Sequence, residues 1–198
     1  MALTSIALFC GSAWGNHPEY SKVAHDFGKR CADEKITLYY GGACIGLMDV
    51  AAKAALANNG KVIGISPTFF TRDVVQPETL TEFIAVKTMS ERKQLLEKRA
   101  DAFVALPGGF GTMDELFEII TDAQLGLHNK PIAVLNTLNY YAPLLEQLAH
   151  FQKEGFLKPF HHDLLMVADT IETLFEKIKT YQNPNRSDWL QKVKHKNE

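Results

Sequence analysis

Short apolar runs alternate with longer amphipathic stretches from one end of the chain to the other. Several of these runs are apolar on both faces, which is typical of strands covered by helices on each side of a parallel sheet. The predicted strands span residues 6–10, 36–40, 61–65, 83–86, 102–106, 132–135 and 164–167. The pattern predicts an α/β fold, a Rossmann-like doubly wound parallel sheet of about seven strands with helices on both faces.

Sheets of this kind bind ligands at the carboxyl ends of their strands, so the loops after the predicted strands are where chemistry is expected. The longest irregular stretch, residues 66–77, is bracketed by prolines and has two interpretations, a flap over a site or an ordinary surface connection. Residues 1–182 are predicted to form a single domain. Residues 183–198 are polar and are predicted to form a tail with a short helix and a frayed end.

Composition and charge narrow the function classes. The chain has 198 residues, 46% of them hydrophobic, which suffices for one sizeable core. Lys and Arg number 21 against 23 Asp and Glu, so no broad positive field gathers a nucleic acid polymer, and any anion site is local. No segment has the length of a membrane span, and the start lacks the basic region of a signal peptide.

The cysteines and histidines show no metal-binding pattern. Cys10, Cys31 and Cys44 are scattered without CxxC spacing, which disfavours a disulfide framework or a zinc site and favours a reducing compartment. The histidines form no ligand spacing either. We therefore expect a cytoplasmic protein that holds no metal or cofactor and has no membrane or nucleic acid partner.

A glycine-rich loop with the sequence PGGFGT lies between a predicted strand and a helical stripe. Glycines let a ligand approach backbone N–H groups closely, and the dipole of the following helix favours an anion such as phosphate. The alternative is a tight turn with Thr112 as the helix N-cap. The candidate phosphate-binding residues are Gly108, Gly109, Phe110, Gly111 and Thr112.

Two further glycine segments follow predicted strands. Residues 41–46 (GGACIG) precede another helix, and Gly11 and Ser12 follow the first strand. In a parallel sheet all three loops open on one edge, so we expect them to line one crevice, with Ser12 and Gly42 as further candidates for substrate binding. Neither the GxxxxGK[ST] pattern nor a clean GxGxxG fingerprint is present, which disfavours an ATPase or a dehydrogenase.

Two cations lie near the apolar face of a helix predicted over residues 89–100. Arg92 and Lys93 flank the stripe formed by Met89, Leu96 and Ala100. Since an unpaired buried charge is costly, each needs a carboxylate, a bound phosphate or access to water. The alternative is that both side chains extend along the surface to solvent.

Glu115 has two interpretations. With Thr112 as N-cap it completes a TxxE capping box, a structural role whose loss costs only ~1 kcal/mol. It also faces the mouth of the glycine loop, where a carboxylate disfavours an anion unless cations compensate. Arg92 and Lys93 are the nearest cations in sequence, so phosphate, cations and carboxylate are compatible if they share one site.

The sequences MSERK at residues 89–93 and PGGFGTMDE at residues 107–115 resemble the paired MxxRK and PGGxGTxxE motifs of the LONELY GUY (LOG) family of phosphoribohydrolases. The resemblance extends along nearly the whole chain except the polar tail. It implies cleavage of nucleoside 5'-monophosphates, including AMP or cytokinin ribotides, into free base and ribose 5-phosphate. It also implies a homodimer with active sites near the interface.

By position, the resemblance makes Arg92 and Glu115 the catalytic pair, and by analogy with glycosidase carboxylates we expect Glu115 to stabilise an oxocarbenium-like sugar and to position or deprotonate the water. It places the substrate-binding residues at Lys93, Gly109, Phe110, Gly111, Thr112 and Thr121. The chain departs from the family pattern at Ala43, Asp49 and Asp122, which bears on base preference and subunit packing. Two alternatives stay open: a non-catalytic nucleotide or cofactor carrier like the molybdenum-cofactor carriers, and an amino-acid decarboxylase with a pyridoxal cofactor.

Overall fold

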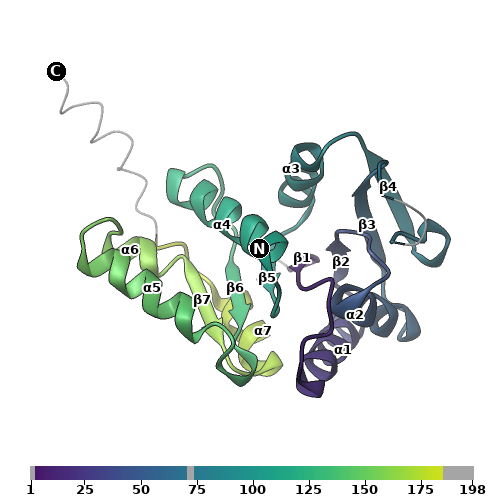
Figure 1. The fold of residues 1–198 in the computed structure, drawn as a ribbon, viewed down its shortest axis with the longest axis horizontal. Coiled ribbons are helices and arrows are strands. Elements are labelled where there is room, and N and C mark those ends of the chain that lie inside the picture. The colour runs from purple at the N-terminus through teal and green to yellow at the C-terminus, as the bar shows by residue number, and fades with distance from the viewer. Residues whose placement is uncertain (1–2, 71–73, 185–198) are drawn as a thin grey trace.

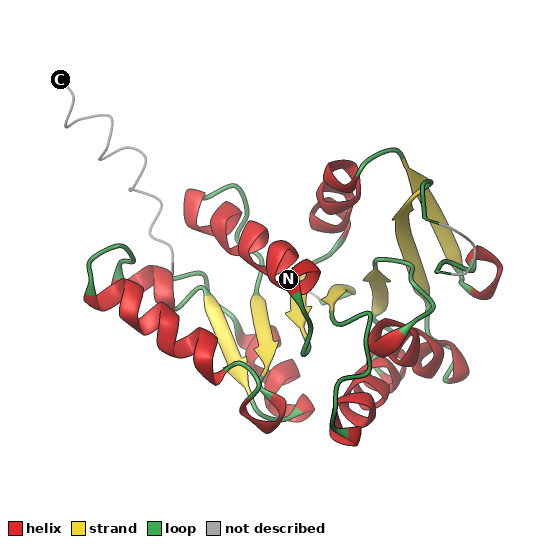
Figure 2. Cartoon of the chain, in the orientation of Figure 1, coloured by secondary structure: helices red, strands yellow, loops and turns green. Residues whose placement is uncertain are grey.

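Seven parallel strands form one sheet in the order β4-β3-β2-β1-β5-β6-β7. The computed structural model describes residues 3–70 and 74–184. Figures 1 and 2 show the strands side by side, with helices packed around them. The strands are β1 (Ser5–Phe9), β2 (Thr37–Tyr40), β3 (Val62–Pro67), β4 (Glu82–Val86), β5 (Ala102–Ala105), β6 (Ile132–Leu135) and β7 (Leu165–Ala168).

Helices connect the strands and cover both faces of the sheet. The α-helices are α1 (Pro18–Asp33), α2 (Gly46–Ala57), α3 (Met89–Arg99), α4 (Phe110–Leu125), α5 (Ala142–Lys153), α6 (Pro159–His162) and α7 (Ile171–Thr180). Short 3₁₀ turns, η1 (Pro77–Thr79) and η2 (Thr137–Asn139), precede β4 and α5. Helices α1, α2 and α7 bury one hydrophobic core against the sheet, and α3, α4 and α5 bury a second on its other face.

The predicted α/β class and all seven predicted strands are confirmed. Central strands such as β1 and β5 are buried along their whole length, which explains their continuous apolar runs. The strand ends differ from the predictions by at most two residues, and β6 matches its prediction at both ends. The largest difference is in β3, which runs on through Pro67 and takes the first two residues of the irregular stretch predicted over 66–77.

The chain reverses direction across the sheet once. Strands β1 to β4 are added toward one edge, and β5 then returns to the other side of β1. The carboxyl ends of β1 and β5 therefore flank a topological switch point, where doubly wound sheets open a crevice. Of the predicted tail, residues 185–198, with the predicted short helix, lie outside the described residues.

Candidate active site

A crevice of about 440 Å³ opens at the carboxyl edge of the sheet. Its walls come from the loops after β1, β2, β3 and β5, from the first turn of α2, from α3, and from the first turns of α4. The three glycine loops therefore meet in one crevice, as predicted. The lining residues are Cys10, Gly11, Ser12, Gly41, Ala43, Ile45, Met48, Ser66, Phe70, Val74, Val75, Met89, Arg92, Gly109, Phe110, Gly111, Thr112 and Glu115.

A buried ion pair lies in this crevice. Arg92 of α3 donates from Nη2 to Oε1 of Glu115 in α4, and the two side chains are only 12% and 9% exposed. Within the described part of the chain, Nε of Arg92 is buried without a hydrogen-bond partner. Gly41 makes room for the guanidinium, because a Cβ at that position would lie 3.2 Å from Cζ of Arg92. Arg92 was expected to need a carboxylate, a bound phosphate or access to water, and the structure provides the carboxylate.

Burial determines the proton chemistry of the crevice. Removal of Glu115 from water raises the pKa of its carboxyl, while the charge of Arg92 acts in the opposite direction. Burial also raises the pKa of the Cys10 thiol, to which the nearby carboxylate adds. A thiol that keeps its proton is a poor nucleophile and cannot accept a proton from water. Glu115 is therefore better suited than Cys10 to proton transfer.

The N-terminus of α4 opens into the crevice and can hold an anion. The helix begins at Phe110 with Gly109 as N-cap, and its first main-chain bond runs from Met113 N to Gly109 O at 3.1 Å. The N–H groups of Phe110, Gly111 and Thr112 have no acceptor within the helix, so they are available to a phosphate. A Cβ at Gly109 or Gly111 would meet nothing within 4 Å, so this backbone is open to a ligand.

The interpretation of Thr112 as N-cap in a capping box with Glu115 is wrong, because α4 begins before Thr112 and the carboxylate pairs with Arg92 instead. The Thr112 side chain packs on Gly108, where an added Cβ would lie 2.1 Å from Oγ1. The carbonyl of Gly108 accepts a hydrogen bond from the Tyr140 hydroxyl at 2.5 Å. These contacts fix the glycine loop from both sides.

Two predicted substrate residues lie away from the crevice lining. Lys93 turns to the side of α4, where it pairs with Glu118 and with Asp114 at 3.2 Å. Thr121 is exposed on the outer face of α4, and its hydroxyl donates to the carbonyl of Phe117 at 2.7 Å. Neither side chain lines the crevice between the glycine loops.

Other predicted residues are placed as follows. Ser12 is exposed and lines the crevice. Gly42 is buried behind the lining at a φ of 78°, and a Cβ there would lie 3.4 Å from Cβ of Ser66, so it shapes the loop after β2. Gly108 acts through its carbonyl and its contact with Thr112.

One side of the crevice is formed by the segment after β3, for which the sequence left two interpretations, a flap over a site or a surface connection, and named no site residue. Ser66, Phe70, Val74 and Val75 line it, and Cys44 N donates to Val74 O at 2.7 Å, which holds the segment against the β2 loop. Part of the stretch over residues 66–77 thus borders the site, while residues 71–73 lie outside the described residues. The available signal was the position of Ser66 at the end of a predicted strand.

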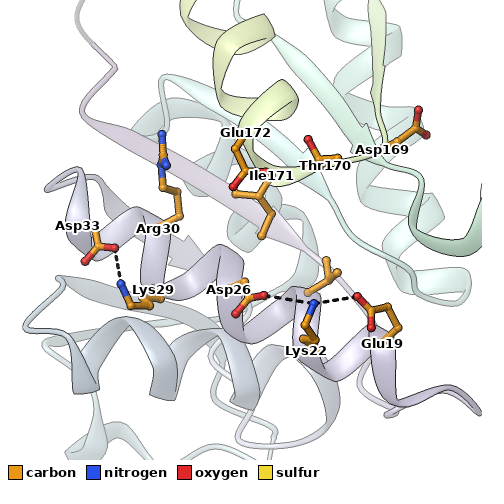
Figure 3. A pocket seen from close by; sticks show the side chains of 11 residues that line it. Glu19, Lys22, Asp26, Lys29, Arg30, Asp33, Asp169, Thr170, Ile171 and Glu172 are labelled. Carbon is orange, nitrogen blue, oxygen red and sulfur yellow. Dashed lines mark hydrogen bonds and ion pairs between the residues drawn. The ribbon is translucent and has the colours of Figure 1, made fainter.

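A second cavity, of about 460 Å³, lies between α1 and the start of α7. Figure 3 shows that several of its charged side chains pair with one another, Lys22 with Glu19 and Asp26, and Lys29 with Asp33. These mutual pairs leave the cavity without the concentration of one charge that an ionic ligand needs.

Two structural features are absent from residues 3–70 and 74–184. No group of three His, Cys, Asp or Glu side chains is placed to hold a metal ion in these residues. No helix among them combines the length and the apolar character that a membrane span requires.

Comparison with known proteins identifies the family. Residues 48–178 match the family model described as "Possible lysine decarboxylase". The cytokinin riboside 5'-monophosphate phosphoribohydrolase of Rhodococcoides fascians is 42% identical over 89% of this chain and 89% of its own. The chain belongs to the LOG family. A probable LOG enzyme of Arabidopsis thaliana is 41% identical over 89% of this chain and 88% of its own.

Solved structures extend the likeness in fold. The molybdenum cofactor binding protein from Rippkaea orientalis superposes on this LOG family chain with a TM-score of 0.68 and 24% identity, covering 91% of this chain and 98% of its own. The molybdenum cofactor carrier protein from Chlamydomonas reinhardtii has a TM-score of 0.66 and 20% identity, covering 90% and 97%. At these identities the likeness shows the shared fold.

Proposed function

We propose that the protein hydrolyses the N-glycosidic bond of nucleoside 5'-monophosphates, AMP or cytokinin ribotides, to the free base and ribose 5-phosphate. The observation that carries the proposal is the buried pair of Arg92 and Glu115 beside the N-terminus of α4. It puts a carboxylate next to a place for a phosphate. Relatives named as cytokinin riboside 5'-monophosphate phosphoribohydrolases support the same activity.

The 5'-phosphate binds at the start of α4. The N–H groups of Phe110, Gly111 and Thr112 donate to its oxygens, and the helix dipole adds a favourable field. Binding energy gained there fixes the ribose over the ion pair, so that a remote group of the substrate contributes to the rate at the reacting carbon.

Glu115 carries the chemistry. The bond between the anomeric carbon and the base nitrogen breaks, and its electron pair leaves with the base, which takes up a proton. The carboxylate stabilises the oxocarbenium character of the sugar, as in glycosidases. A water then attacks the anomeric carbon and gives its proton to Glu115, which returns it to solvent.

Arg92 has two roles in this scheme. Through Nη2 it opposes the effect of burial on the pKa of Glu115 and favours the ionised form that the reaction requires. Its Nε–H has no partner among the described residues and is available to a ribose hydroxyl or a phosphate oxygen.

The test is to incubate the purified protein with AMP and with AMP prenylated on its 6-amino group, and to follow free base by chromatography. Release that disappears in Glu115→Gln supports the proposal, and the ratio of the two rates gives the base preference. If neither nucleotide releases base while calorimetry shows that both bind, the protein is a carrier and the proposed hydrolysis is refuted.

A pyridoxal-dependent decarboxylase needs a lysine that can lose its proton and form a Schiff base. Lys93 is unsuited to this role, because its contact with Glu118 raises the pKa of its ammonium group. The ion pairs with Glu118 and Asp114 also occupy the side chain away from the crevice.

The proposed enzyme is a cytoplasmic homodimer that pairs through the outer face of α4. The thiols of Cys10 and Cys31 take part in no disulfide among the described residues, which fits a reducing compartment. Phe110 is 97% exposed, and with Met113, Phe117 and Thr121 it borders a shallow hollow on this face. A partner covering the hollow buries this exposed apolar surface and brings Thr121 toward the interface, where it is available to a second crevice.

A further inference from the structure

Ser66 is a buried hydroxyl that the proposed mechanism does not use. It is the second-last residue of β3, is 1% exposed, and lines the crevice. In the part of the chain that the structure describes, its Oγ has no hydrogen-bond partner. Buried hydroxyl groups are normally paired, so an unpaired one in the wall of a ligand site points to the ligand as its partner.

The surroundings of Ser66 are apolar. Ala43, Phe70, Val74 and Val75 form the same side of the crevice, and a Cβ added at Gly42 would lie 3.4 Å from Cβ of Ser66. Among these described residues Ser66 supplies the one side-chain hydroxyl. An apolar wall with a single polar group suits the flat ring system of a base, because the wall covers the faces while the hydroxyl contacts one edge.

The order of the strands places Ser66 at the base end of a bound nucleotide. The anion site follows β5, the guanidinium of Arg92 lies over Gly41 after β2, and Ser66 ends β3. From β5 to β3 there are three strand spacings, about 14 Å in all. In a nucleoside 5'-monophosphate the phosphate and the base lie on opposite sides of the ribose, so a substrate anchored at α4 and cleaved beside Glu115 extends its base toward β3.

We propose that Ser66 determines base specificity by accepting a hydrogen bond from the 6-amino group of an adenine base. This inference rests on the proposed function, because it uses the position of the phosphate and of the cleaved bond. A site with a buried acceptor discriminates against a base that lacks the matching donor, since the hydroxyl is then left unpaired.

The experiment compares AMP with purine riboside 5'-monophosphate, which lacks the 6-amino group, in the wild type and in Ser66→Ala. We expect kcat/KM for AMP to fall about tenfold in Ser66→Ala, while kcat/KM for the analogue changes less than about twofold. An equal fall for both substrates, or no fall for AMP, overturns the proposal.

Thr137 supplies a matched control. Its Oγ1 is also buried and unpaired among the described residues, but Thr137 does not line the crevice. Thr137→Val removes a similar hydroxyl and is expected to leave the ratio of the two substrates unchanged. A change in that ratio as large as the one in Ser66→Ala overturns the assignment to Ser66.

Binding measurements separate this inference from the proposed function. In the Glu115→Gln background, where turnover is removed, calorimetry reads affinity alone. In that background, Ser66→Ala is expected to weaken the binding of AMP about tenfold and to leave the affinity for the analogue unchanged. Absence of base release from every substrate in the wild type refutes the hydrolysis. An equal affinity for AMP in Glu115→Gln with and without Ser66→Ala refutes the role of Ser66.

Discussion

Replacement of Arg92 by Met leaves Glu115 as a buried carboxylate without its partner. Local motifs alone would give this site only the small stabilisation of a helix cap, but the two side chains are 12% and 9% exposed and belong to different helices. Loss of one member of a buried ion pair typically costs about 3–5 kcal/mol. At about 2–4 °C per kcal/mol for a chain of this size, the melting temperature of Arg92→Met falls by roughly 6–20 °C.

The double variant Arg92→Met with Glu115→Leu should behave differently. It removes both charges and fills the space with apolar atoms, which is often neutral or stabilising. We expect its melting temperature to return to within about 4 °C of the wild type, a difference of roughly 1 kcal/mol, while base release stays abolished. Stability and activity are thereby separated in one set of proteins.

The adjacent Lys93→Met is the control. Its partners Asp114 and Glu118 are 59% and 36% exposed, so its ion pairs contribute only about 0–1 kcal/mol. Thermal unfolding followed by circular dichroism measures all the variants. Equal shifts for Arg92→Met and Lys93→Met, or a double variant no more stable than Arg92→Met, would refute the reasoning from burial.

Three further outcomes are expected. Adenosine should be cleaved at least about a hundredfold less efficiently than AMP, because it cannot bind the N–H groups at α4, and equal turnover by chromatography would contradict the phosphate anchor. The acid limb of kcat/KM should lie above pH 4.5, since burial raises the pKa of Glu115 and the active carboxylate is lost as pH falls through that value; a pH–rate profile flat down to 4.5 would exclude Glu115 as the base. Phe117→Glu should shift sedimentation from dimer to monomer, whereas a wild type that sediments as a monomer rules out the α4 interface.

The strands could be predicted because both faces of a parallel sheet are covered, which leaves continuous apolar runs in the sequence. Their ends could not, since the last paired residue depends on the neighbouring strand. Pro67, for example, pairs with Val86 of β4, a contact that no local pattern contains.

Local motifs misled where a distant partner decided the outcome. The TxxE spacing at Thr112 and Glu115 satisfies a capping box, yet the carboxylate binds Arg92, 23 residues away. The helical pattern put Lys93 near an apolar face without showing that α4 supplies the carboxylates beside it. Ser66 was missed because a hydroxyl without a partner is a property of the folded chain alone.

The switch point of the sheet has a consequence for how the site is assembled. Arg92 lies in α3, at the end of the half of the chain that contains β1 to β4. Glu115 lies in α4, in the half that contains β5 to β7. Each half alone carries one member of this ion pair without its counterpart, so neither half contains the complete site. Fragments divided between α3 and β5 would each be inert, and catalysis would report directly on their reassembly.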